Sequence, residues 1–212
     1  MSGRVSASRR RVVAPRLQSS AVYIAAAALT AAALALPLWG FAMSAPQYPG
    51  ETLHLRIART GIVGDVHEIT TLQQYIGVRF PSELPELRWA TRAVRLLTVL
   101  LIGAAFTGGG RVGRSYRIAC AAAFLAFLCA AAGAVQMRLY RVGHEREANS
   151  PIRAVGAFTP PLLGPIKVGN FTVWSFPHVG AVLLLGGAAL SAAGARRSGG
   201  RVFPPARDKA AA

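Results

Sequence analysis

Charged residues are scarce in this sequence, and acidic residues are scarcer still. Only 15% of the 212 residues are Asp, Glu, Lys or Arg, whereas soluble domains average about 25%. Eight residues are acidic and 24 are Lys or Arg, so the formal net charge is +16. With 53% apolar residues, this composition argues against an ordinary soluble domain and favours an integral membrane protein.

Cysteine is nearly absent as well. The two cysteines, Cys120 and Cys129, lie in one apolar run, and the sequence has no C-x-x-C or C-x-x-C-H motif. This excludes a covalently attached haem of the usual kind and a dithiol redox pair. The motifs G-x-S-x-G and G-K-[ST] are also missing, so neither a serine nucleophile nor a phosphate loop is indicated. We therefore expect a protein that is not an enzyme.

Long apolar runs are what the sequence has in abundance. About 20 apolar residues suffice to span the hydrocarbon of a bilayer. The runs predict an all-α membrane protein with four transmembrane helices and a small mixed extracytoplasmic cap formed by two loops. The predicted spans are 21–43, 90–106, 118–137 and 171–195, the loops are 44–89 and 138–170, and the remaining segments are a turn at 107–117 and basic tails at 1–20 and 196–212.

Two of these runs leave alternatives open. The first could instead be a cleaved signal peptide, but it exceeds the usual apolar length of about 7–15 residues. It also ends in Trp39, which suits a membrane interface, and Pro37 is expected to kink the helix. In the second run, Arg92 and Arg95 either reach outward to the interface or point into the bundle at a functional site.

The first loop carries local structure of its own. Residues 52–57 alternate between polar and apolar side chains, which predicts a half-buried strand. Residues 61–64 contain two glycines and predict a turn. Asp65 and Glu68 then match a capping box, and the apolar stripe that follows predicts a short amphipathic helix over 66–76. The second loop contains four prolines, which favour extended, turn-rich backbone.

Basic residues are distributed unevenly along the chain. The two tails and the 107–117 turn contain five, five and three Lys or Arg, which is 13 of the 24, together with one acidic residue. The positive-inside rule places these three segments in the cytoplasm and both larger loops outside. This predicts a multi-pass protein of the bacterial inner membrane with both termini cytoplasmic. Because the arginines flank apolar runs, we expect them to face anionic lipid rather than nucleic acid.

Histidines provide the only candidate ligands for a metal. In this topology all four fall on the outer side, where imidazole with methionine thioether would suit copper and imidazole with carboxylate would suit zinc. The spacing matches no known ligand motif, and the alternative is that these are ordinary loop residues. A haem held between spans through His178 or His144 is a rival possibility. The candidate metal ligands are His54, His67, His144 and His178.

Several short motifs resemble a poorly characterised family of bacterial multi-span membrane proteins. They are A-P-Q-Y-P at 45–49, E-I-T-T-L-Q-Q-Y-I-G-V at 68–78, G-H at 143–144, F-T-P-P-L-L-G at 158–164 and N-F-T at 170–172. The resemblance covers most of residues 40–190 and implies a setting of copper-protein and nitrous-oxide-reductase maturation. The family motif reads E-I-N-x-L-N-H-Y-I-G-M, so Gln74 and Val78 stand where a histidine and a methionine are expected. Of the family's histidines, the resemblance retains His144.

These observations together predict a non-catalytic membrane accessory protein or complex subunit. Its outer cap would bind a protein partner in the membrane or periplasm, or assist copper delivery to an exported enzyme. Two other hypotheses are a haem-binding redox subunit and a purely structural subunit of a membrane complex.

Overall fold

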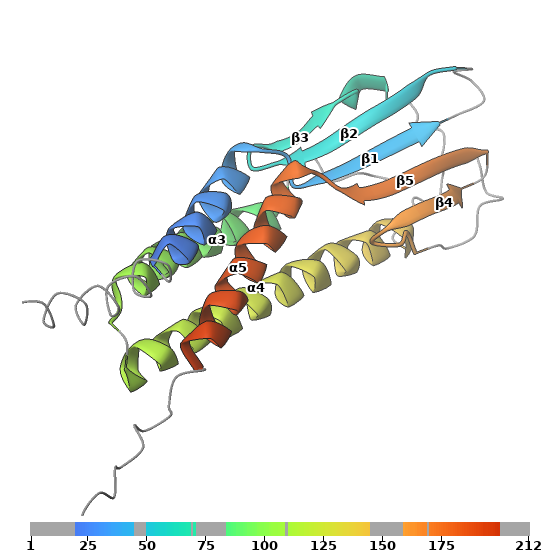
Figure 1. Ribbon diagram of the computed structural model, residues 1–212. Helices are drawn as coiled ribbons and strands as arrows, with labels where there is room; N and C mark the ends of the chain where they lie inside the picture. The colour runs from blue at the N-terminus through green and yellow to red at the C-terminus, as the bar shows by residue number, and fades with distance from the viewer. Residues whose placement is uncertain are drawn as a thin grey trace, which may run out of the picture.

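The protein consists of a bundle of apolar helices with a β-sheet at one end of it (Figure 1). The computed structural model describes residues 20–44, 50–68, 70, 84–108, 110–144, 159–168 and 170–199. Within these ranges the helical bundle comprises a first helix, Ser20–Ala35, whose last turn is the 3-10 helix η1 (Ala33–Ala35), and then α3 (Pro85–Phe106), α4 (Arg111–His144) and α5 (Val179–Gly199).

The sheet has five strands, and every neighbouring pair is antiparallel. Their order is β3-β2-β1-β5-β4, so β1 in the centre pairs with strands from both halves of the chain. The strands are β1 (Trp39–Ser44), β2 (Thr52–Ala58), β3 (Gly61–Gly64), β4 (Gly164–Val168) and β5 (Phe171–Pro177). The two predicted outer loops therefore contribute strands to one sheet, together with residues that had been assigned to the spans.

The predicted all-α fold with four transmembrane helices is wrong. Residues 39–43, assigned to the first span, belong to strand β1, and residues 171–177, assigned to the fourth span, form the adjacent strand β5. In the first case Leu36, before Pro37, is extended (φ −117°, ψ 153°), because proline disfavours helical geometry in the residue before it. Both segments are rich in aromatic and small residues, and a hydropathy run does not distinguish a buried strand from a helix.

Three helices, α3, α4 and α5, are long and apolar enough to cross a membrane, which indicates membrane association. The first helix is shorter, at about 24 Å for its 16 residues. Helix α4 has 34 residues and a length of about 51 Å, well beyond the roughly 30 Å of a hydrocarbon core. Its C-terminal third runs alongside the sheet (Figure 1).

The loop predictions had mixed outcomes. The predicted strand at 52–57 is confirmed as β2, in which Leu53 and Leu55 are buried and their neighbours are exposed. The predicted turn at 61–64 is wrong, because these residues form β3 and the turn lies at 59–60. Helix follows Asp65 at 66–68 and includes Thr70, and residues 69 and 71–76 of the predicted 66–76 helix lie outside the described residues. Asp65 itself accepts a hydrogen bond from the backbone N–H of His54 at 2.8 Å.

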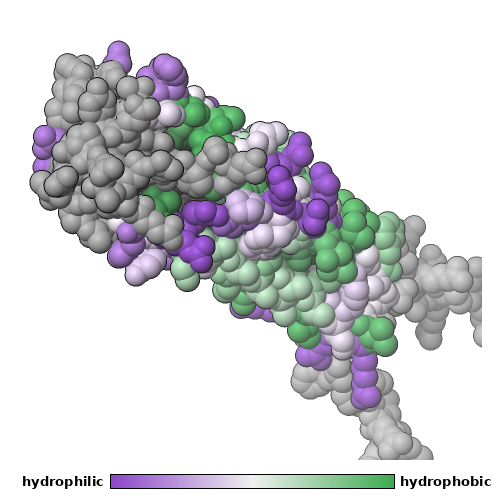
Figure 2. Space-filling view, turned by 180° about the vertical axis from the view of Figure 1, so that it is seen from behind, coloured by the Kyte–Doolittle hydropathy of each residue, from purple (hydrophilic) through white to green (hydrophobic). Residues whose placement is uncertain are grey.

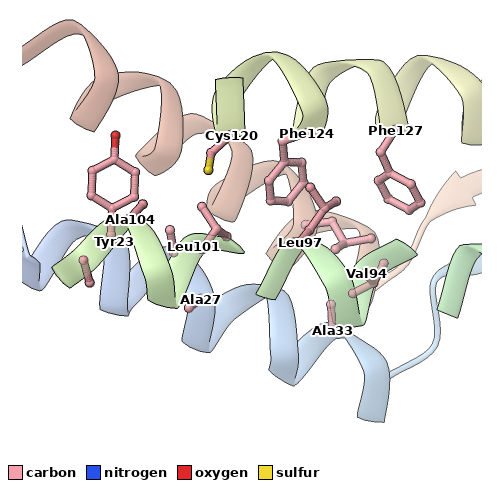
Figure 3. Close-up of a cluster of buried hydrophobic side chains, with 13 residues drawn as sticks. Tyr23, Ala27, Ala33, Val94, Leu97, Leu101, Ala104, Cys120, Phe124 and Phe127 are labelled. Carbon is pink, nitrogen blue, oxygen red and sulfur yellow. The ribbon is translucent and has the colours of Figure 1, made fainter. Parts of the chain in front are cut away.

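The core of the helical bundle combines small residues with a few large aromatic ones (Figure 3). Tyr23 from the first helix, Leu101 from α3 and Phe124 from α4 are fully buried. Glycines let α5 approach closely: a Cβ on Gly187 would lie 2.6 Å from the Thr30 hydroxyl oxygen. Close approach of small residues is the usual way that helices pack in a membrane, where lipid provides no hydrophobic driving force.

One end of the bundle is strongly basic. Ser20 donates a hydrogen bond to the Ala105 carbonyl, and the Arg117 guanidinium lies 5.3 Å from the centre of the Tyr23 ring. These contacts join the start of the first helix, the end of α3 and the start of α4, and the C-terminal part of α5 lies beside them through the Tyr23 bond to Ser191. The arginines gathered at this end, opposite the sheet, are Arg111, Arg114, Arg117, Arg196 and Arg197.

Candidate functional site

The four candidate histidines do not form a cluster. His54 is exposed on β2, and its Cα partner on β1 is Ala42. His67 is exposed in the short helix after β3. Across the described parts of the chain, no group of three or more His, Cys, Asp or Glu is placed to hold a metal ion.

The other two histidines lie at opposite ends of the sheet region. His144 ends α4, where its Nδ1 is 2.9 Å from the Tyr140 carbonyl and its ring stacks on Tyr140 with centroids 3.9 Å apart. His178 lies between β5 and α5, next to the bundle, and its backbone N–H donates to the Leu38 carbonyl. Its Nδ1 is buried and, among the described residues, has no hydrogen-bond partner. The metal and haem predictions for these residues stay predictions.

The sheet has two unlike faces. Side chains that are paired across strands share a face, so Phe41 of β1, Leu55 and Ile57 of β2 and Ile62 of β3 lie together. They line a small cavity of about 100 Å³ whose other wall is α3 and the C-terminal part of α4. This face of the sheet is therefore covered by the helices, and we call it the inner sheet face.

The opposite face, which we call the outer sheet face, carries aromatic and basic side chains. Trp174 is 52% exposed and Phe176 is 37% exposed. The register places Phe176 opposite Gly40, and a Cβ on Gly40 would lie 2.6 Å from the Phe176 ring, so the ring rests on the glycine. Basic side chains flank these aromatics on the same face: His54 and Arg56 on β2 and Lys167 on β4. The strand residues that share this face include no carboxylate.

A larger pocket lies where the bundle meets the sheet. We call it the junction pocket; its volume is about 440 Å³ and it is open rather than enclosed. Its walls come from the first helix, α3, α4 and α5, and its roof from the ends of β1, β2 and β5. Almost all of its surface is apolar, with Trp39, Trp89 and Phe127 as its largest side chains. Trp89 meets Phe127 edge-to-face, with ring centroids 6.1 Å apart.

An ion pair stands between this pocket and the sheet. Glu86, in the first turn of α3, accepts hydrogen bonds from Arg138 of α4 through one carboxylate oxygen, at 2.5 and 3.0 Å. Its other oxygen, Oε2, is buried and has no partner within the described ranges. Both side chains keep a little over a quarter of their surface exposed. Glu86 lines both cavities, so it is the acidic group at the junction of the two regions.

Sequence reasoning did not identify the junction pocket, the Glu86–Arg138 pair or the outer sheet face. A usable signal was Trp174-Ser175-Phe176, in which a buried polar residue separates two exposed aromatics. That alternation has the period of a strand. The ion pair joins residues 52 positions apart, so no local sequence pattern predicts it.

The chain matches no family model, no curated protein and no solved structure.

Proposed function

We propose that this protein is a non-catalytic accessory subunit of a bacterial inner membrane that uses its outer sheet face to bind a protein partner outside the cytoplasm. The observation that carries the proposal is the pair of exposed aromatic side chains, Trp174 and Phe176, on a face that also carries the basic side chains of Arg56 and Lys167. Exposed aromatics beside arginine are typical of the centres of protein interfaces.

The orientation follows from the basic end of the bundle. Arg111 and Arg114 of α4 and Arg196 and Arg197 of α5 lie opposite the sheet, and under the positive-inside rule this supports a cytoplasmic position for that end and an outer position for the sheet. The first described residue of the first helix and the last residue of α5 lie at that same end (Figure 1), which favours cytoplasmic termini. Cysteine labelling tests this in a Cys120→Ala, Cys129→Ala background. An impermeant maleimide should label Thr52→Cys in intact spheroplasts and Arg114→Cys only after permeabilisation; the reverse pattern would contradict the orientation.

The chemistry of the outer sheet face selects the partner. Arg56 and Lys167 give it a positive rim, so the matching surface is an apolar patch with acidic residues around it. Copper delivery is not needed for this interaction and stays a prediction of the sequence resemblance, since the described residues assemble no metal site.

Photo-crosslinking in whole cells tests partner binding. A benzophenone amino acid at position 174 should give a discrete adduct with a protein of acidic surface, whereas the same probe at Tyr140, exposed on α4, should give none. Charge reversal is the decisive comparison. Arg56→Glu should abolish the adduct and Arg141→Glu, an exposed arginine of α4, should leave it unchanged. An adduct that survives Arg56→Glu, or that forms equally at both probe positions, would contradict the proposal.

A further inference from the structure

The junction pocket has the surface chemistry of a site for a hydrocarbon chain. Among the residues that the structure describes, its only ionisable lining side chains are Arg59, Glu86 and Cys129, and Glu86 is already paired with Arg138. A volume of about 440 Å³ is within the roughly 300–1,000 Å³ of small-molecule sites. The pocket is lined by the three helices that can cross a membrane, so a chain could enter it from the bilayer without passing through water.

Exposed residues in the lining show that the pocket reaches the outside of the bundle. Cys129 of α4 and Leu185 of α5 are exposed on one side. Arg59, in the turn between β2 and β3, is also exposed and lines the pocket. These positions put lipid-facing surface and a basic side chain at the same pocket.

Two further arginines, Arg92 and Arg95, lie on α3, which also lines the pocket. Thr91 is half-buried and lines the pocket, and Arg95, four residues later, is its neighbour on the helix surface. Arg92 and Arg95 lie opposite the side of α3 on which Val94, Leu97 and Leu101 are buried, and both are exposed. Further along the same exposed side come Val99 and Phe106. Hydrophilic side chains therefore interrupt the apolar surface of the bundle near its sheet end (Figure 2).

Within the described residues, neither Arg92 nor Arg95 has a carboxylate partner. Guanidinium groups on the lipid-facing side of a helix are costly unless they reach the headgroup region, where phosphates accept their hydrogen bonds. Arginine suits this role because its planar fork matches the geometry of a phosphate. The arginines are therefore suited to a phosphate group, and the apolar pocket is suited to a hydrocarbon chain of the same molecule.

We propose that the junction pocket binds one anionic phospholipid of the surrounding bilayer, with an acyl chain in the pocket and its phosphate at Arg59 and Arg95. The buried Oε2 of Glu86 is a free acceptor at the pocket wall and accepts a hydrogen bond from a headgroup or glycerol hydroxyl. This site is separate from the outer sheet face, which lies on the other side of the sheet's strands from the pocket-facing side chains.

Fluorescence quenching tests the position of the chain. The three tryptophans are Trp39, Trp89 and Trp174, and the first two line the pocket. In a Trp174→Phe background of the full chain, phosphatidylglycerol with brominated acyl chains should quench the remaining emission saturably at low mole fraction in nanodiscs. Brominated phosphatidylcholine has the same phosphate, but its choline cation cancels the net charge, so roughly fivefold more lipid should be needed for each arginine whose attraction to a net negative headgroup is lost.

Matched variants separate the two parts of the site. Ala131→Phe fills the pocket, because Ala131 lines it, whereas Ala126→Phe adds the same ring to an exposed position of α4 outside the lining. The first should reduce quenching to the level given by random lipid contact, and the second should leave it unchanged. Arg59→Gln with Arg95→Gln should remove the preference for phosphatidylglycerol, and Arg111→Gln with Arg114→Gln, at the other end of the bundle, should keep it.

Native mass spectrometry of the detergent-extracted chain gives an independent readout that does not depend on the tryptophans. One retained phosphatidylglycerol is expected, and it should be lost in Ala131→Phe protein that still unfolds cooperatively. Retention of no lipid by the unmodified chain, equal retention of both lipid classes, or loss of preference in the Arg111, Arg114 variant would overturn the proposal. Equal quenching in the Ala131→Phe and Ala126→Phe proteins would also overturn it.

Discussion

The helical bundle and the sheet expose opposite kinds of surface although both are built from apolar sequence. The bundle exposes large apolar side chains such as Leu96, Val99 and Leu125, each at least 60% exposed, while its core buries many alanines with a few large residues. In the sheet, β2 buries Leu53 and Leu55 and exposes polar residues between them. The bundle surface is thus suited to lipid, and one face of the sheet is suited to water. Apolar residues therefore face outward in the bundle and inward in β2.

The two regions are joined by main-chain hydrogen bonds at one level of the structure. Leu38 N–H donates to the Ile57 carbonyl at 2.7 Å, His178 N–H to the Leu38 carbonyl at 3.1 Å, and Gly180 N–H to the Pro37 carbonyl at 2.8 Å. These bonds satisfy backbone groups at the end of the first helix and the start of α5, which would otherwise be unpaired. The comparison therefore predicts that substitutions where these hydrogen bonds join the bundle to the sheet destabilise both regions, whereas substitutions within one region destabilise that region alone.

The largest effect is expected for Gly180→Val. A Cβ at position 180 would lie 2.7 Å from the Pro37 carbonyl oxygen and 2.9 Å from that of Leu36. Backbone atoms cannot rotate away as a side chain can, so the start of α5 must move from β1. We expect a loss of about 3 kcal/mol or more in the apparent free energy of unfolding, measured by guanidinium titration in mild detergent.

Gly133→Val is the control for that change. It introduces the same β-branched residue into a helix, at a position where a Cβ would have no neighbour within 4 Å. Valine is a slightly better helix former than glycine, so the free energy of unfolding should change by no more than about 0.5 kcal/mol. Equal losses in both variants would show that the junction is no more sensitive than the helix surface.

A smaller effect is expected when the ion pair between α3 and α4 is broken. Arg138→Met leaves the Glu86 carboxylate at the pocket wall without its cation, and roughly 2 kcal/mol should be lost, because the pair is partly exposed and solvent screens it. Adding Glu86→Gln should restore part of that loss by removing the unpaired charge. Unfolding titrations of the two single variants and the double variant measure the coupling.

Arg141→Met serves as the control, because Arg141 is exposed on the same helix three residues later. It should change the free energy of unfolding by no more than about 0.5 kcal/mol. A double variant that is no more stable than Arg138→Met alone would contradict the assignment of an unpaired carboxylate.

Much of this contrast could be predicted from the sequence. The central parts of α3, α4 and α5 follow from apolar runs, and β2 follows from strict alternation. The ends of α4 do not, because Arg111–His144 includes residues that were predicted as a turn at 107–117 and as part of the loop at 138–170. Strands β1 and β5 could not be found in the same way, because Trp39–Ser44 and Phe171–Pro177 continue the hydropathy of the neighbouring helices. Their pairing, over six residues, is a contact between residues more than 125 positions apart, and hydropathy contains no information about it.

The candidate site was less predictable than the fold. Histidines were the candidate site residues because imidazole is a common metal ligand. However, His54 and His144 lie on different elements, and the described residues around them form no metal site. The junction pocket is formed by residues from four helices and three strands, each of which reads locally as ordinary apolar packing. A cavity is a property of how elements meet, so single-sequence periodicity does not reveal it.

The smallest effect is expected within the sheet, at Ser175. This buried hydroxyl donates to the Leu162 carbonyl and accepts from the Trp39 indole N–H, both at 2.8 Å. Ser175→Ala removes both bonds but creates almost no cavity, so about 1 kcal/mol should be lost. Because Trp39 stands at the bundle end of β1, its emission in a Trp174→Phe background should also shift, while Thr172→Ala, in the same strand but on the outer sheet face, should leave it unchanged. If Ser175→Ala lowered the free energy of unfolding as much as Gly180→Val, the two Ser175 hydrogen bonds would be essential for attaching the sheet to the bundle. That result would contradict the view that changes within the sheet stay local.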